Sequence, residues 1–137
     1  MKKQLVFISL IAGISLVFWS FRQATVQPGD KGVGPIKEVK LGPVNQQMAN
    51  EGKSIFSSKC IACHSLDQKV VGPPLRNVTK RRTPEYVMNM ILNPTNMENN
   101  DPITKELHKK YIVPMTDQGF KQSEARALLE YLRSVEK

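Results

Sequence analysis

The sequence predicts an all-α fold, and three observations support it. Toward the C-terminal end, apolar residues recur three or four positions apart and form one stripe of an amphipathic helix: Ala125, Leu128, Leu129, Leu132 and Val135. Two dipeptides, Thr83-Pro84 and Asp101-Pro102, combine a capping side chain with a proline in the first turn, which is typical of helix starts. No segment alternates apolar and polar residues as a half-buried strand would. Three or four helices joined by loops are therefore expected.

Residues 1–22 are predicted to be a membrane anchor or a signal segment. Lys2 and Lys3 precede an apolar stretch from Leu5 to Phe21, and Arg22 ends it. Large aromatic residues occupy the place where a cleavage site needs small ones, so an uncleaved single-span anchor is favoured over a removed signal. Because positive residues stay inside, both alternatives place the rest of the chain on the periplasmic side of an inner membrane. A cleaved signal would leave it soluble in the periplasm.

Residues 23–44 are predicted to be a flexible linker. They contain three prolines and four glycines among charged residues, and no apolar period emerges. The helical domain follows at residues 45–137. Its expected elements, in order, are a helix running from about 45 into 60, a loop at 67–75, helices at 84–92 and 102–110, a loop at 111–120 and a last helix from 123.

The pentapeptide Cys60-Ile61-Ala62-Cys63-His64 is a Cys-x-x-Cys-His motif, which is typical of c-type haem attachment. Two thiols at this spacing reach the two vinyl groups of one porphyrin edge and form thioether bonds. The imidazole that follows can bind the iron as proximal ligand. The motif therefore predicts one covalent haem c, with His64 as an iron ligand.

Three other interpretations of these cysteines are weaker. A thioredoxin-like dithiol expects a βαβ setting, but the residues before Cys60 have helical spacing. A structural zinc site needs about four ligands, and beyond the motif the chain offers only the distant His108. A disulfide between Cys60 and Cys63 would close a very short loop and stabilise little.

The charge of the chain favours protein docking over nucleic-acid binding. The formal net charge is +8, with 20 basic and 12 acidic residues. No basic run is interleaved with aromatic residues, so no nucleic-acid interface is expected. Lysines near an exposed haem edge could instead steer an acidic redox partner.

These motifs resemble the class I monohaem cytochrome c family, in particular its small bacterial members. Gly52 and Phe56 match the family's N-terminal helix, and Tyr131 and Leu132 match the C-terminal helix that packs against it. The resemblance covers about residue 48 to the end. It implies a cytochrome c fold of three to four helices wrapped around one covalent haem, preceded here by the N-terminal apolar segment.

The resemblance also assigns roles near the iron. Gly72-Pro73-Pro74-Leu75 resembles the family's Gly-Pro-x-Leu turn, so the Pro73 carbonyl should accept a hydrogen bond from the proximal imidazole. In the family the second axial ligand is a methionine before the C-terminal helix, which implies Met115, although Pro114 precedes it where the family often has a proline after it. Met97, expected in a mobile loop, is the main rival. His108 is expected to be a solvated histidine on a polar helix.

The haem propionates need donors when they are partly buried. Arg81, Arg82 and Tyr86 resemble the family's Arg-Arg-x-x-x-aromatic stretch, with Tyr86 in place of the frequent tryptophan, and Arg76 lies nearby in the sequence. A surface role for each arginine remains open.

The expected function is an electron carrier rather than an enzyme. A haem held by His64 and Met115 has both axial positions filled, so one electron would pass through the porphyrin edge near Cys60 and Cys63. The expected partners are a respiratory reductase, an oxidase or a quinol-oxidising complex outside the inner membrane. Two alternatives remain: a haem enzyme or gas sensor with an open or displaceable sixth ligand, and a domain whose haem is only structural. The segment 94–111 is a candidate docking insert.

Overall fold

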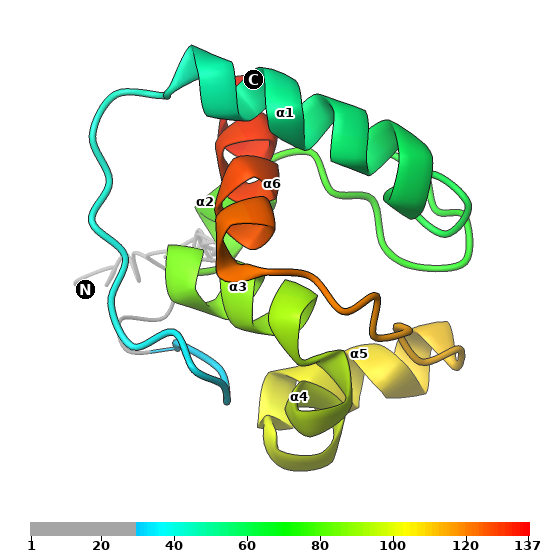
Figure 1. Cartoon of the computed structure of the whole chain (residues 1–137). Coiled ribbons are helices and arrows are strands. Elements are labelled where there is room, and N and C mark those ends of the chain that lie inside the picture. Colours follow the sequence, from blue (N-terminus) through cyan, green and yellow to red (C-terminus); the bar gives the residue numbers. More distant parts are fainter. Residues whose placement is uncertain (1–29) are drawn as a thin grey trace, which may run out of the picture.

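The structure is a computed structural model that describes residues 30–137, so the expected anchor and the first part of the expected linker lie outside the described residues. Within this range the chain forms only helices and connecting segments, and the predicted all-α fold is confirmed (Figure 1). None of the described helices is both long enough and apolar enough to cross a bilayer. In order, the elements are α1 (Gln46–Ile55), the π-helical turn η1 (Phe56–Cys60), α2 (Val78–Arg81), α3 (Pro84–Leu92), α4 (Pro94–Asn100), α5 (Pro102–Tyr111) and α6 (Gln122–Ser134).

The first and last helices cross at a glycine. A Cβ on Gly52 would collide with the backbone carbonyl of Ala127 in α6, so only glycine allows α1 and α6 to approach this closely. Beside the crossing, the rings of Phe56 and Tyr131 lie 5.3 Å apart at an interplanar angle of 52°, a tilted arrangement that aromatic pairs favour. The packing of these two helices, expected from the resemblance, is present.

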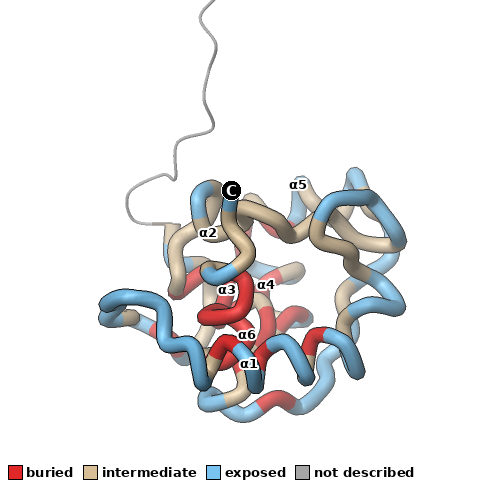
Figure 2. Tube along the Cα trace, turned by 90° about the horizontal axis from the view of Figure 1, so that it is seen from above, coloured by how far each residue is buried: buried red, intermediate tan, exposed pale blue. Residues whose placement is uncertain are grey.

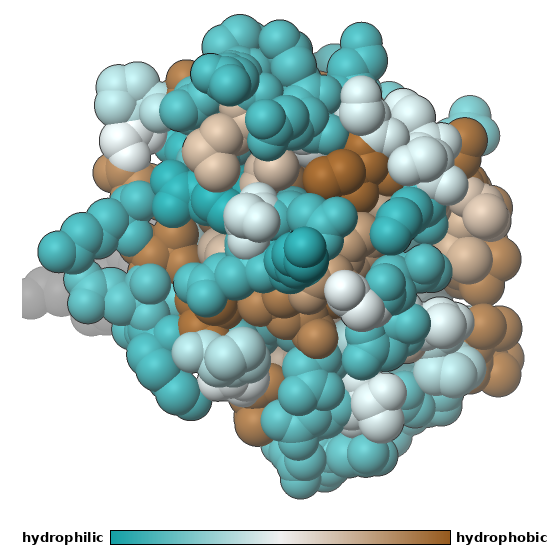
Figure 3. All heavy atoms as spheres, viewed as in Figure 1, coloured by the Kyte–Doolittle hydropathy of each residue, from teal (hydrophilic) through white to brown (hydrophobic). Residues whose placement is uncertain are grey.

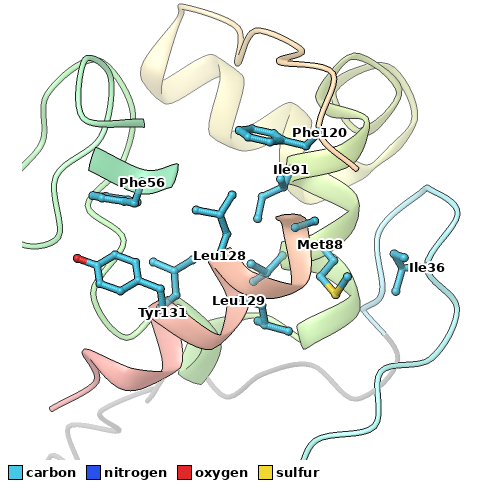
Figure 4. Packing of buried hydrophobic residues seen from close by; sticks show 11 residues of the cluster. Ile36, Phe56, Met88, Ile91, Phe120, Leu128, Leu129 and Tyr131 are labelled. Carbon is cyan, nitrogen blue, oxygen red and sulfur yellow. The ribbon is translucent and has the colours of Figure 1, made fainter. Parts of the chain in front are cut away.

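The apolar stripe of α6 forms the centre of the core. Of the five residues in the predicted stripe, Ala125, Leu128, Leu129 and Leu132 are buried, whereas Val135 lies just past the end of α6 and is only partly buried. In Figure 2 the buried residues concentrate on α6, on α3 and on the inner face of α1. Figure 4 shows side chains from α3, from α6 and from the end of the loop that precedes α6 meeting in one cluster.

Two of the helices that follow the motif, α3 and α5, begin as their capping residues predict, whereas the short helix α2 starts without a side-chain cap. The hydroxyl of Thr83 accepts the Tyr86 N–H at 3.1 Å and starts α3. The carboxylate of Asp101 accepts the Thr104 N–H at 2.7 Å and starts α5. These local signals therefore gave the two helix starts correctly.

Helix α4 is a correction to the predicted loop around Met97. Asn93-Pro94 agrees with the predicted end of a helix at residue 92, because the residue before a proline disfavours helical backbone. In the structure the same dipeptide also starts α4, because the Asn93 side chain accepts the Asn96 N–H at 3.2 Å and Pro94 occupies the first turn. Met97 is consequently fully buried, with an exposed fraction of 0%.

Residues 30–44, expected to belong to a flexible linker, form an extended strap that packs on the helices. The strap passes α3 and leads into α1 (Figure 1). Its main fastening is the fully buried side chain of Asn89 in α3, whose amide nitrogen donates to the carbonyls of Lys31 and Ile36, both at 2.9 Å. The Asn89 side-chain oxygen accepts the Ile36 N–H at 2.9 Å. The side chain of Ile36 is itself buried in the core cluster.

Other side chains hold the rest of the strap. The carboxylate of Glu85 accepts the Val39 N–H at 2.9 Å, and the sulphur of Met97 accepts the Val33 N–H at 3.0 Å. Near α1, the guanidinium of Arg133 donates to the Gly42 carbonyl at 2.7 Å. The strap lacks the regular period of a helix or strand, so its sequence indicated only a linker. Its order comes from partners 46 to 91 positions away in the sequence.

Replacing Gly52 with alanine is expected to destabilise the protein. Alanine favours a helix over glycine by about 1 kcal/mol, but the collision with Ala127 should outweigh this gain and cost about 1–3 kcal/mol. The free energy of unfolding of the haem-loaded protein, measured by denaturant titration, should fall. Gly42→Ala is the matched control, because no atom lies within 4 Å of a Cβ at that position. Equal stability of the two variants would contradict a tight helix crossing.

Replacing Asn89 with alanine should release the strap. Three hydrogen bonds to the strap backbone are lost, and each is worth about 0.5–1.5 kcal/mol. Hydrogen exchange followed by mass spectrometry should show faster exchange in peptides covering residues 30–44, with α6 peptides unchanged. Asn99→Ala, at an exposed position of α4, is the control. Unchanged exchange in the strap would show that Asn89 does not hold it.

Candidate functional site

The Cys-x-x-Cys-His motif lies at the end of the first helical segment. The π-helical turn η1 ends at Cys60, whose carbonyl accepts the N–H groups of Cys63 at 3.1 Å and of His64 at 2.8 Å. This extra turn brings the two cysteines and the histidine together. Neither cysteine forms a disulfide; Cys60 is half-buried and Cys63 is exposed. Burial raises the pKa of the Cys60 thiol.

The imidazole of His64 is fixed by a carbonyl of the turn at residues 72–75. Its Nδ1 lies 3.0 Å from the Pro73 oxygen. Because a carbonyl only accepts, Nδ1 carries the proton and Nε2 keeps its lone pair for a metal. This is the contact that the resemblance implied for Pro73.

Gly72 lets the backbone pass directly against this ring. A Cβ at Gly72 would lie 2.9 Å from Nδ1 of His64 and closer still to the neighbouring ring carbon. The Gly72 N–H donates to the Cys63 carbonyl at 2.8 Å and so ties the turn to the motif. The turn and the motif therefore form one unit around the imidazole.

The surroundings of the motif fit a large apolar cofactor. Cys60, Leu66 and Leu75 are only partly buried, and each packs on the core cluster. Their uncovered sides offer apolar surface next to two free thiols and an imidazole with a free Nε2. This combination of groups suits a haem that is attached by thioether bonds and bound through one histidine.

The loop at residues 112–121 carries Met115. Two cation–π contacts fasten its flanks: the Lys69 nitrogen lies 5.3 Å from the Tyr111 ring, and the Lys59 nitrogen lies 5.0 Å from the Phe120 ring. Figure 1 shows the loop on the same side of the molecule as the segment that follows the motif. Between residues 112 and 119, Met115 is half-buried and the other residues are exposed.

The rivals of Met115 have other partners. Met97 lies in α4, and its sulphur accepts a hydrogen bond from the N–H of Val33 in the strap. His108 lies on α5, where its Nδ1 is 3.2 Å from the Glu98 carboxylate at the partly exposed surface. Met97 and His108 therefore have partners away from the motif, and Met115 as second ligand stays a prediction.

The three residues expected near the propionates contact protein groups. Arg81 donates to the carbonyls of Arg76 at 2.8 Å and Pro74 at 3.2 Å. The guanidinium of Arg82 lies 5.4 Å from the centre of the Tyr86 ring. The hydroxyl of Tyr86 is buried and lies 2.7 Å from the Thr104 hydroxyl, and burial raises its pKa.

Arg76 makes contacts that sequence reasoning did not identify. One of its nitrogens lies 2.8 Å from the Asp67 carboxylate, and another donates to the Val135 carbonyl at 2.5 Å. The hydrogen bond from Arg76 lowers the pKa of Asp67. In the sequence, the only sign of a role for Arg76 is its position directly after the turn at residues 72–75.

The zinc interpretation gains no support. Across residues 30–137, no three histidine, cysteine, aspartate or glutamate side chains gather as a metal site would require. His108 lies on α5 and its partner is Glu98, which is not a residue of the motif.

Comparisons with known proteins agree with this site. A family model described as cytochrome c matches residues 49–136. A stretch of 35 residues is 49% identical to cytochrome c-551 of Stutzerimonas stutzeri; it covers 25% of this chain and about a third (34%) of that relative's length. Cytochrome c from Rhodothermus marinus superposes with a TM-score of 0.73 at 47% identity, covering 74% of this chain and 89% of the other. An engineered cytochrome c from that organism, bound to a carbene intermediate, gives a TM-score of 0.69 at 45% identity, covering 74% and 89%.

Replacing Gly72 with alanine should displace the His64 ring, because the added methyl group would occupy its space. The melting temperature of the haem-loaded protein should fall by about 4–8 °C for each kcal/mol of stability lost. The NMR signals of the His64 ring should also shift. Gly42→Ala should change neither quantity. A Gly72→Ala protein with the original His64 signals would disprove the close contact.

Proposed function

Because this chain belongs to the cytochrome c family and binds one covalent haem c, we propose that it carries single electrons between respiratory-chain components outside the inner membrane. The general role of a haem-based electron carrier follows from the family. The respiratory setting, the location and the residue assignments below are the proposal. The contact between His64 and Pro73 is the observation that carries the assignments.

In this proposal the motif holds the cofactor. Cys60 and Cys63 would form the two thioether bonds, and Nε2 of His64 would bind the iron. The hydrogen bond to the Pro73 carbonyl orients the imidazole and makes Nε2 a better electron donor. The bound haem supplies an iron that cycles between ferric and ferrous states, taking one electron from a reduced partner and giving one to an oxidised partner.

Met115 is proposed as the second axial ligand. A thioether is a soft, neutral ligand, and with it both axial positions are filled by the protein. The contacts of Lys69 and Lys59 with the two flanks of its loop would hold the sulphur near the iron. If His64 and Met115 both bind the iron, no position would be left for a substrate or a gas, which would favour electron transfer.

Exposed apolar residues near the motif are proposed to meet the redox partner. The exposed fractions are 57% for Ile61, 46% for Val70, 74% for Ile112 and 57% for Val113. In Figure 3 apolar side chains gather along the edge of the molecule where the loops that hold these residues lie. Lys69 and Lys110 flank this area at the Tyr111 ring. An apolar surface with positive charge around it suits a partner with an acidic rim, such as a respiratory reductase, an oxidase or a quinol-oxidising complex.

The N-terminal segment is proposed to anchor the domain to the membrane. The support is the sequence itself: two lysines, an apolar stretch at 5–21 and an arginine after it. Such an anchor keeps the domain on the periplasmic side, and cleavage of the segment would give a soluble periplasmic form.

Replacing Met115 with alanine should open one axial position of the iron. The ferric wild-type protein should show the weak long-wavelength absorption band of a methionine ligand, and the variant should lose it. The reduced variant should bind carbon monoxide, whereas the reduced wild-type protein should not. Absorption spectroscopy of the haem-loaded proteins measures all of these changes.

Met97→Leu is the control, because the sulphur of Met97 is assigned to the strap. It should keep the long-wavelength band. Loss of the band in Met97→Leu but not in Met115→Ala would reverse the ligand assignment. Carbon monoxide binding by untreated, reduced wild-type protein would favour the haem enzyme or gas sensor over the electron carrier.

A further inference from the structure

The turn that holds His64 has a gap in its backbone hydrogen bonds. On one side of the gap, the Gly72 N–H donates to the Cys63 carbonyl at 2.8 Å. On the other side, the N–H groups of Leu75 and Arg76 donate to residues 65 and 66 at 2.9 and 2.8 Å. Pro73 and Pro74 have no N–H to add. The backbone is therefore least supported where the Pro73 carbonyl meets the imidazole.

Arg81 supports this gap from the end of α2. One terminal nitrogen of its guanidinium donates to the Arg76 carbonyl at 2.8 Å, and the other donates to the Pro74 carbonyl at 3.2 Å. One rigid, planar group thus holds the carbonyl of Pro74, which directly follows Pro73, and the carbonyl of Arg76, which directly follows the turn. A lysine ammonium is a point donor and cannot reproduce this fork.

Arg76 holds the same turn from the other side. Its guanidinium pairs with the Asp67 carboxylate at 2.8 Å and donates to the Val135 carbonyl after α6 at 2.5 Å. The backbone of Arg76 is itself a partner of Arg81. The two arginines therefore connect the turn to α2, to the segment after the motif and to the C-terminal end.

We propose that Arg81 is a positioning residue, which holds the turn so that the Pro73 carbonyl stays on Nδ1 of His64. The proposal rests on the role of His64 as proximal ligand. It differs from the propionate contact that the resemblance implied for Arg81. A firm Nδ1–H···O bond increases electron donation from the imidazole and so favours ferric iron, whereas a looser bond favours ferrous iron. Arg81 thereby keeps the reduction potential low.

The test is Arg81→Lys in the full-length, haem-loaded protein. This change keeps the charge but removes the fork. The midpoint potential, measured by spectroelectrochemistry, should become more positive by the same amount from mildly acidic to mildly alkaline pH. The Nδ1 proton of His64, observed by NMR in the ferrous protein, should exchange with solvent about tenfold faster, which corresponds to about 1.4 kcal/mol.

Arg126→Lys in α6 is the matched control, because the Arg126 guanidinium pairs with the Glu130 carboxylate and donates to no group of the turn. It should change neither the potential nor the exchange rate. If Arg81→Lys also leaves both unchanged, the proposal is overturned. If Arg81→Met shifts the potential only by giving it a new pH dependence, Arg81 acts on an ionisable propionate, and the proposal is likewise overturned.

Asp67→Asn provides a second route that does not alter Arg81. It weakens the hold of Arg76 on the turn through an exposed carboxylate, so the fold should tolerate it. The midpoint potential of the haem should again become more positive. An unchanged midpoint potential would count against the proposal that the two arginines hold the turn in place. Failure of the proposed function would show separately, as a wild-type protein without covalent haem or without a histidine ligand.

Discussion

The structure around the haem site depends on one hydrogen bond, between Nδ1 of His64 and the Pro73 carbonyl. It fixes the tautomer and the orientation of the ring, so it leaves Nε2 as the nitrogen that is free to bind a metal. The surrounding elements serve this contact. The turn η1 delivers the histidine, Gly72 lets the backbone come close, and Arg81 supports the turn where two prolines leave it without donors.

The helices give this local unit a rigid base. The crossing of α1 and α6 at Gly52 positions the segment that carries the motif, and the end of α6 accepts a hydrogen bond from Arg76 at Val135. Helices α4 and α5 lead to the loop that carries Met115, and α5 is fixed to α3 through the contact between Tyr86 and Thr104. Both expected axial ligands therefore belong to segments that are joined to the same core, which suits a centre that changes charge with little movement.

Local signals in the sequence predicted the parts of the fold that depend on local physics. The caps at Thr83 and Asp101 gave two helix starts, and the apolar period of α6 gave its buried face. The Cys-x-x-Cys-His motif indicated the likeness to a known family. The Gly-Pro turn predicted the hydrogen bond between His64 and the Pro73 carbonyl. The strap could not be predicted, because its hydrogen bonds go to side chains such as Asn89 that lie far away in the sequence. Helix α4 was missed because Asn93-Pro94 ends one helix and starts the next. The partners of Arg81 became visible only in three dimensions.

The docked strap also limits how far an anchored domain can travel. With residues 30–44 free, the chain from Arg22 to the first helix could extend about 80 Å. The carbonyl of Asp30 accepts a hydrogen bond from the Thr83 hydroxyl, so the strap is attached to the domain from Asp30 onward. The distance between the anchor and the domain is then limited by the chain from Arg22 to Asp30, which can span about 28 Å at most. In the membrane-anchored form proposed above, the domain would stay close to the bilayer surface, and an electron acceptor would have to present its own cofactor within that shallow layer.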